Sequence, residues 1–198
     1  MNDDHVGRLL AAAIHQAISD ELPTRIDFYE HWLRGERMRD GGVGLAPMTA
    51  VMGFLRAEGP PYHSVMAHAG RCAADWTSEA MPSFRRRLFM AMPRWWRSRA
   101  VLGLAATAIR QGYGPSRAVV QVRRGLARIE IRHSLFCRVR ESQAAAQCDF
   151  HAAMIMGLLA SFGLPGTFEI ERCTGSGGSM CVIAVDLNMV APSMEAHS

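Results

Sequence analysis

The C-terminal segment of the chain concentrates side chains that bind metals. Cys148 and His151 lie three residues apart, and Cys173 and Cys181 flank a glycine-rich turn. Thiolates and imidazoles are ligands for zinc and other soft or borderline metals. Residues three apart on a helix share one face, and a glycine-rich turn lets a second strand return beside the first. A helix packed on such a hairpin would therefore bring the four side chains to one point.

The residues of this cluster predict a closed tetrahedral site. Cys148, Cys173 and Cys181 would bind zinc together with either His151 or Glu171, and the binding energy would contribute to folding. Two alternatives stay open. The cysteines are small enough to pack simply as buried side chains, or they carry redox chemistry.

Two further cysteines give weaker signals. Cys72 lies among alanines on a helical stretch, which is typical of the core, whereas Cys137 follows a strand and is expected as an exposed thiol. The N-terminus lacks the basic start and cleavage site of a secretory signal, and the apolar run 100–109 is too short to span a membrane. We therefore expect a cytoplasmic protein with reduced cysteines and no membrane span.

Arginine supplies the entire positive charge of the chain. The formal net charge is +4, with 22 basic residues and no lysine. Arginines cluster at 85–87, 94–99 and 123–124, and such clusters suit carboxylates or phosphates because the guanidinium binds them bidentately. These clusters lack a recognisable nucleic-acid reading motif, so we expect no nucleic-acid partner.

Apolar residues recur at helical spacing through the first half of the chain. Small residues at 69–70 and 72–74 indicate that another backbone approaches one of these helices closely. The spacing and the breaks at proline and glycine predict helices over 5–22, 24–37, 45–58, 62–80, 82–93 and 101–110.

The period then changes to an alternation of apolar and polar residues. Residues 117–123 and 126–133 predict a hairpin joined at Arg124–Gly125. A helix over 144–162 follows, and then a second hairpin over 167–172 and 180–187. Helices followed by strands predict an α+β fold, with a helical half packed on an antiparallel sheet of two hairpins. We divide the chain into an N-terminal helical arm (1–42), a ligand-binding domain (43–190) and a disordered tail (191–198).

The same C-terminal residues resemble the end of the 4-vinyl-reductase domain, a family related to TRAPP vesicle-tethering subunits. The resemblance rests on Cys148-Asp-Phe-His at a helix start, on Phe168-Glu-Ile-Glu-Arg-Cys173, and on Gly178-Ser-Met-Cys181. The segment 62–71 resembles an earlier helix of the family. Among stand-alone members, the bacteriochlorophyll 4-vinyl reductase group is the most similar, because it shares the Cys-x-x-His opening.

The resemblance implies a dimeric α+β domain that encloses a pocket for a hydrophobic ligand. In phenol-sensing regulators with this domain, three cysteines and a glutamate hold a structural zinc, which places the ligands at Cys148, Cys173, Cys181 and a glutamate near Glu171. The family glutamate stands three residues before its cysteine, whereas Glu171 stands two before Cys173. This departure leaves His151 as a rival fourth ligand.

From this likeness we expect a carrier or accessory protein for a tetrapyrrole intermediate of (bacterio)chlorophyll biosynthesis, possessing no catalytic residues of its own and working beside a biosynthetic enzyme. Two alternatives are a 4-vinyl reductase, with His68 or Tyr62 as proton donor, and a small-molecule or redox sensor. His68 is also the best candidate for a haem ligand, although a hydrogen-bonded structural histidine is the simpler interpretation. We expect the ligand to contact Met66, His68, Arg71, Trp76, Leu102 and Met154.

Overall fold

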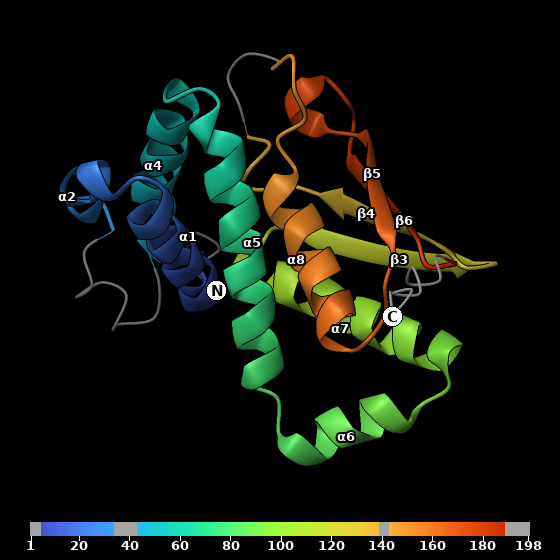
Figure 1. Ribbon diagram of the computed structural model, residues 1–198. Helices are drawn as coiled ribbons and strands as arrows, with labels where there is room; N and C mark the ends of the chain where they lie inside the picture. Colours follow the sequence, from blue (N-terminus) through green and yellow to red (C-terminus); the bar gives the residue numbers. More distant parts are fainter. Residues whose placement is uncertain (1–4, 34–42, 139–142, 189–198) are drawn as a thin grey trace, which may run out of the picture.

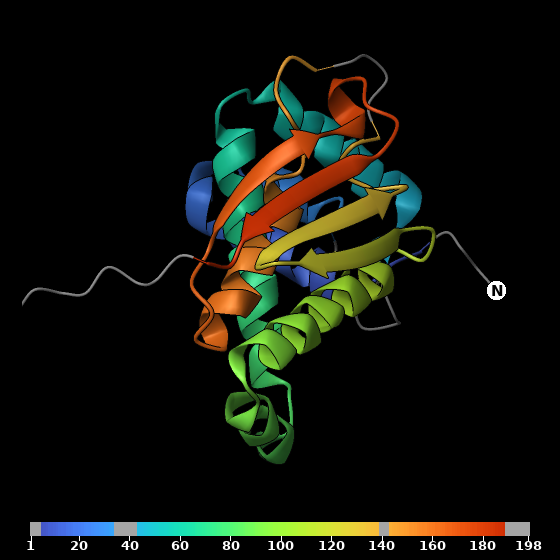
Figure 2. The ribbon, with the colours of Figure 1, turned by 90° about the vertical axis from the view of Figure 1, so that its right-hand side faces the viewer.

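A layer of helices covers one face of a four-stranded sheet in the computed structural model, which describes residues 5–33, 43–138 and 143–188. Figure 1 shows the helices on one side of the sheet, and Figure 2 shows the opposite face of the sheet without a covering helix. The helices are α1 (Arg8–Glu21), α2 (Ile26–Glu30), α4 (Leu45–Ala57), α5 (Pro61–Glu79), α6 (Ser83–Ala91), α7 (Arg94–Gly112) and α8 (Asp149–Ser161), with short 3-10 turns at Pro23–Arg25 and Thr174–Ser176.

The sheet is antiparallel throughout, with the order β3-β4-β6-β5. Its strands are β3 (Arg117–Arg123), β4 (Leu126–Arg132), β5 (Thr167–Arg172) and β6 (Cys181–Asp186). A separate two-stranded pair joins β1 (His5–Val6) to β2 (Val43–Gly44). The α+β prediction is confirmed.

Alternation along the strands decides which side of the sheet meets the helices. Ala127, Ile129 and Ile131 of β4 are buried, while Arg128 and Arg132 between and beyond them are exposed. The tight turn between β3 and β4 lies where the sequence predicted it, and both of its residues have positive φ, 49° at Arg124 and 81° at Gly125. Positive φ at both positions is the geometry of a two-residue hairpin loop.

Four predicted helices differ from the observed ones. The helix expected over 5–22 begins at Arg8, because His5–Val6 form β1, and the helix expected over 101–110 begins at Arg94. The helix expected over 24–37 is a 3-10 turn followed by α2, which ends at Glu30, and residues 34–42 lie outside the described ranges. The helix expected from residue 144 begins at Asp149, because Cys148 at its N-cap has φ −100° and ψ 11°. The predicted tail at 191–198 also lies outside the described residues. The division of the chain at residue 42 stays a prediction. Helix α1, which belongs to the predicted N-terminal arm, packs on α5 of the predicted ligand-binding domain.

Small residues let α5 and α8 cross closely, as the sequence indicated. A Cβ on Gly70 of α5 would collide with the backbone oxygen of Phe150, and a Cβ on Gly157 of α8 would lie 2.7 Å from the Cβ of Ala74. This crossing fixes the start of α8 against the middle of α5.

Within the described ranges, each helix is too short or too polar to cross a bilayer.

Substituting Gly70 tests this crossing. Gly70→Ala should lower the free energy of unfolding by about 1–3 kcal/mol, because its Cβ would meet a backbone oxygen that cannot swing away. Gly103→Ala is the matched control: this α7 position is exposed, has no atom within 4 Å of the added Cβ, and should gain about 0.5–1 kcal/mol. Chemical denaturation of both variants measures the two effects. Equal, small changes would contradict the close crossing.

Candidate metal centre and ligand cavity

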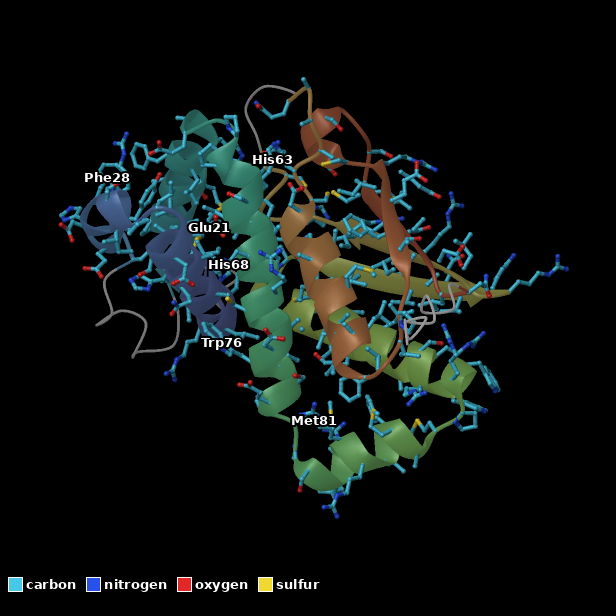
Figure 3. All side chains as sticks on the ribbon, viewed as in Figure 1. Glu21, Phe28, His63, His68, Trp76 and Met81 are labelled. Atoms are coloured by element: carbon cyan, nitrogen blue, oxygen red, sulfur yellow. The ribbon has the colours of Figure 1, made fainter. Side chains whose placement is uncertain are left out.

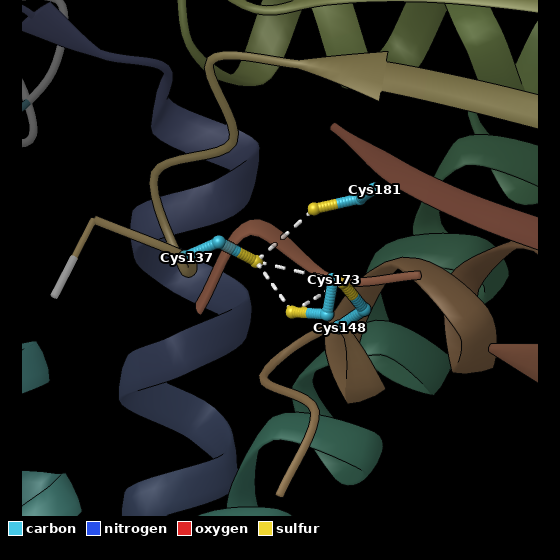
Figure 4. A group of neighbouring side chains, drawn as sticks. All are labelled: Cys137, Cys148, Cys173 and Cys181. Carbon is cyan, nitrogen blue, oxygen red and sulfur yellow. Dashed lines mark hydrogen bonds between the residues drawn. The ribbon is translucent and has the colours of Figure 1, made fainter. Parts of the chain in front are cut away.

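Four cysteines from four separate segments meet at one end of the sheet (Figure 4). The sulfurs of Cys137, Cys148, Cys173 and Cys181 all lie within 4.8 Å of one another, and all four residues are buried. Cys137 Sγ lies 3.4 Å from Cys148 Sγ, 3.5 Å from Cys173 Sγ and 3.4 Å from Cys181 Sγ. These separations are far longer than the ~2.05 Å of a disulfide, so the four sulfurs are separate ligand atoms.

Each cysteine stands where a regular element begins or ends. Cys137 follows β4 in a short loop, and Cys148 is the N-cap of α8. Cys173 directly follows β5, and Cys181 is the first residue of β6. A group bound by all four would therefore tie the sheet to the helix layer.

The spacing of the sulfurs fits a single tetrahedral metal ion. A zinc ion with bonds of about 2.3 Å to four sulfurs separates them by about 3.8 Å, close to the observed distances. An iron–sulfur cluster holds several iron atoms and sulfides between its thiolates and so needs a wider ring. A set of four thiolates leaves no open coordination position, which is the pattern of a structural site.

The hydrogen bonds around the cluster favour thiolates. Backbone N–H groups of Gln147 and Thr174 donate to the sulfurs of Cys173 and Cys181, at 3.2 and 3.4 Å. Hydrogen bonding from Cys137 lowers the pKa of Cys173, whereas hydrogen bonding to Cys137 raises the pKa of Cys148. Without a cation the cluster therefore keeps protons on some sulfurs, and a dication would displace them.

The fourth cysteine is one that the sequence analysis assigned differently. Cys137 is 3% exposed and belongs to the cluster, so the expectation of an exposed thiol is wrong. Neither rival for the fourth position joins the group: Glu171 pairs with Arg128, and the ring of His151 bonds Ser134. Cys72 is half-buried on α5, apart from the cluster.

An arginine braces the two loops that carry Cys137 and Cys148. Arg56, at the end of α4, donates from Nη2 to the backbone oxygen of Phe136 at 2.6 Å and from Nε to Oε1 of Gln147 at 3.3 Å. Phe136 directly precedes Cys137, and Gln147 directly precedes Cys148. The brace holds the two loops together independently of any metal.

A mostly apolar cavity of about 210 Å³ lies beside the cluster. It is partly open to solvent and is bordered by the start of α1, the end of α7, the start of α8, the loop that precedes Cys137, and Ala73 of α5. Its aromatic wall is formed by Phe136 and Phe150, whose rings stack with centroids 4.5 Å apart. The polar groups at its lining include His151, Ser116 and Tyr113, and the Tyr113 hydroxyl accepts a hydrogen bond from Arg138.

His151 lines the cavity and has one ring nitrogen without a protein partner. Its Nε2 lies 3.0 Å from Oγ of Ser134, while its Nδ1 is buried and has no hydrogen-bond partner in the described structure. Burial lowers the pKa of His151 from 6.5 to about 4, so the ring is neutral near pH 7. A neutral ring nitrogen without a partner can pair with one hydrogen-bonding group of a ligand that reaches it.

Of the residues expected to contact a ligand, Met154 lines this cavity. Met66 and Leu102 are fully buried in the core outside its lining, Arg71 is exposed, and Trp76 is half-buried. His68 points from α5 toward Glu21 of α1 (Figure 3), and its ring nitrogens contact Glu21 and Asp20 at 2.9 and 3.2 Å. Ligand contacts by these residues outside the lining stay predictions. Sequence reasoning missed the cavity role of His151, although it singled the residue out.

Comparisons with known proteins find similarity in structure only. No family model and no curated protein matches the sequence. The phenol-responsive sensory domain of the transcription activator PoxR, with phenol, has a TM-score of 0.54 at 13% identity, over 72% of this chain and 74% of that one. The H-NOX domain of SO2144 from Shewanella oneidensis, in its Fe(II)CO state, has a TM-score of 0.59 at 9% identity, over 93% and 99%. At these identities the likeness shows a shared fold.

The role of Cys137 is tested by metal analysis. Purified protein should contain one metal ion per chain. Cys137→Ser should lower the metal affinity by more than about 100-fold. Changing a residue that only supports a metal ligand typically lowers the affinity by about 10- to 100-fold, so a larger loss identifies a direct ligand. Cys72→Ser is the control and should keep the full metal content, because Cys72 lies outside the cluster. Competition with a chromogenic chelator measures both. Unchanged affinity in Cys137→Ser would remove this cysteine from the site.

Proposed function

We propose that this chain is a small-molecule-binding domain whose cavity takes a flat, neutral, one-ring ligand with one hydrogen-bonding group. The observation that carries the proposal is an apolar, aromatic-walled cavity whose lining includes His151, a residue with an unpaired Nδ1. The phenol-responsive sensory domain of PoxR supports it as a neighbour in fold. A sensor or carrier role follows more directly from this geometry than catalysis does.

The metal centre would be structural in this proposal. Zinc is the ion that best suits four thiolates in a closed tetrahedral set in which no position is free for a substrate. It would hold the loop and the helix start that form the aromatic wall. Metal analysis, as described above, distinguishes zinc from a single iron ion, which also accepts four sulfurs.

The size of the cavity bears on the tetrapyrrole hypothesis. Pockets for drug-sized ligands measure about 300–1,000 Å³, and the cavity at about 210 Å³ is smaller than that range. A tetrapyrrole carrier, which the 4-vinyl-reductase resemblance suggests, would require its walls to move apart. A one-ring ligand requires no such movement, and we therefore favour it.

The position of the two candidate proton donors argues against catalysis in this cavity. His68 is engaged by Asp20 and Glu21 outside the cavity lining. Tyr62 is also absent from the lining, and burial raises its pKa above the ordinary value of 10, which makes it a poorer acid.

The predicted homodimer and the predicted biosynthetic partner remain proposals that rest on the resemblance.

Comparing the affinities of phenol and toluene distinguishes the contribution of the hydrogen bond from that of the apolar contacts. The wild-type chain should bind phenol more tightly than toluene by about 10-fold, because toluene leaves the His151 nitrogen unpaired. His151→Phe should abolish this preference while keeping the ring volume. Calorimetric titration of metal-loaded protein with each ligand measures the ratio.

Two further variants complete this experiment. Met154→Trp should block both ligands by filling the cavity, whereas Met66→Leu, in the core outside the lining, should leave both affinities unchanged. Binding of a porphyrin but of neither one-ring compound would instead support the tetrapyrrole hypothesis. Equal binding of phenol by wild type and His151→Phe would remove His151 as the anchor.

The pH dependence of phenol binding follows from the protonation state of His151. Its pKa of about 4 lies below its ordinary value of 6.5, so the ring stays neutral from pH 8 down to pH 5.5, and phenol stays neutral over the same range. The dissociation constant should therefore be flat between these limits and should rise only as the pH falls toward 4. Titrations at pH 5.5, 6.5 and 7.5 check this. A loss of affinity with a midpoint near 6.5 would mean that the ring is solvated rather than buried.

A further inference from the structure

Helix α6 projects from the molecule as a separate corner (Figures 1 and 2). None of its residues is buried. Its link to the core is Phe89, which is partly buried and whose ring centroid lies 5.4 Å from that of Phe162. A helix that contributes so little to the core must have its other faces in contact with solvent or with a partner.

The outward face of α6 is apolar. Phe84 and Leu88 are 69% and 56% exposed, and their i, i+4 spacing places them on one helix face, away from Phe89. The first turn of α7 adds Trp95 and Trp96, each 54% exposed, with ring centroids 4.2 Å apart. Large apolar side chains exposed on two consecutive helices indicate an interaction surface.

Positive charge surrounds these apolar side chains. On the helical wheel Arg85 and Arg87 flank the stripe of Phe84 and Leu88, and Arg99 of α7 lies over the Trp95 ring at 5.4 Å. Residues 80–129 contain half of the chain's 22 basic residues and no aspartate or glutamate. The nearest carboxylates along the chain are those of Asp75 and Glu79 on α5. The occupant of this surface must therefore be anionic.

The combination of apolar and basic groups distinguishes among anionic partners. A second copy that packs this corner against its own would place like charges against each other, which is unfavourable. A nucleic acid would pair with the arginines and stack on the tryptophans but would leave Phe84 and Leu88 without an apolar partner. An anionic bilayer surface satisfies both requirements: phosphates meet the guanidinium groups, the acyl boundary receives the apolar side chains, and tryptophan favours the interface.

We propose that the α6–α7 corner, formed by Phe84, Leu88, Trp95, Trp96, Arg85 and Arg87, docks on an anionic phospholipid surface. Docking would be peripheral, with α6 lying in the plane of the headgroups and its apolar face turned inward. The proposal is independent of the ligand cavity, because no residue of this corner belongs to the cavity lining.

Vesicle flotation tests the proposal with the 198-residue chain. The protein should float with vesicles of phosphatidylcholine mixed with phosphatidylglycerol and should stay unbound with phosphatidylcholine alone. The double variant R85Q/R87Q should lower the partition coefficient by about 25-fold, because each arginine near an anionic surface contributes about a factor of five. Phe84→Ser with Leu88→Ser should lower it by at least about 10-fold. All of these positions are exposed, so the variants should keep the wild-type melting temperature.

A second double variant controls for charge alone. Arg132→Gln and Arg172→Gln remove two exposed arginines elsewhere and should change the partition coefficient by less than about threefold, because solvent ions screen distant charges. Equal losses in the two double variants would overturn the proposal, as would failure of the wild type to float with anionic vesicles. Binding to an oligonucleotide without binding to vesicles would identify the corner as a nucleic-acid surface and would equally overturn it.

Discussion

The convergence of four cysteine sulfurs positions the start of α8 against the ends of three strands. Two of these cysteines also border the cavity wall, since Leu135 and Phe136 directly precede Cys137, and Phe150 and His151 follow Cys148 by two and three residues. Thiolates packed within 4.8 Å repel one another unless a cation or protons lie between them. The geometry of the aromatic wall therefore depends on what holds the sulfurs together, with Arg56 as a second brace on the same two loops.

Local patterns in the sequence predicted most of the fold and singled out three of the four cysteines that meet in the cluster. The change from helical to alternating spacing located the sheet, and Arg124–Gly125 located its first turn, because both signals depend on neighbours within a few residues. Cys148, Cys173 and Cys181 were found because their flanking segments predict a helix start and a hairpin. Cys137 carries no such local signal. Its place in the cluster arises from the path of the loop after β4, which is a tertiary property.

The assignment of His151 shows where spacing arguments fail. Cys148 and His151 would share a helix face only if both were helical, and Cys148 is the N-cap with non-helical dihedral angles. Ser134 then bonds one ring nitrogen of His151. The cavity was beyond prediction for a related reason. Periodicity indicates that Met66, Leu102 and Met154 are buried, but it does not indicate which of them faces a void, because a void depends on how four separate segments fail to fill the space between them.

An ion bound by the four cysteines would be coupled to a ligand bound in the cavity through their shared wall. Phe150 and His151 occupy the first turn of α8, and any ion bound by Cys148 would fix the residue that caps this turn. If ordering that turn raises the affinity for a cavity ligand by some factor, the ligand must raise the affinity for the metal by the same factor, because the two binding free energies form one closed cycle.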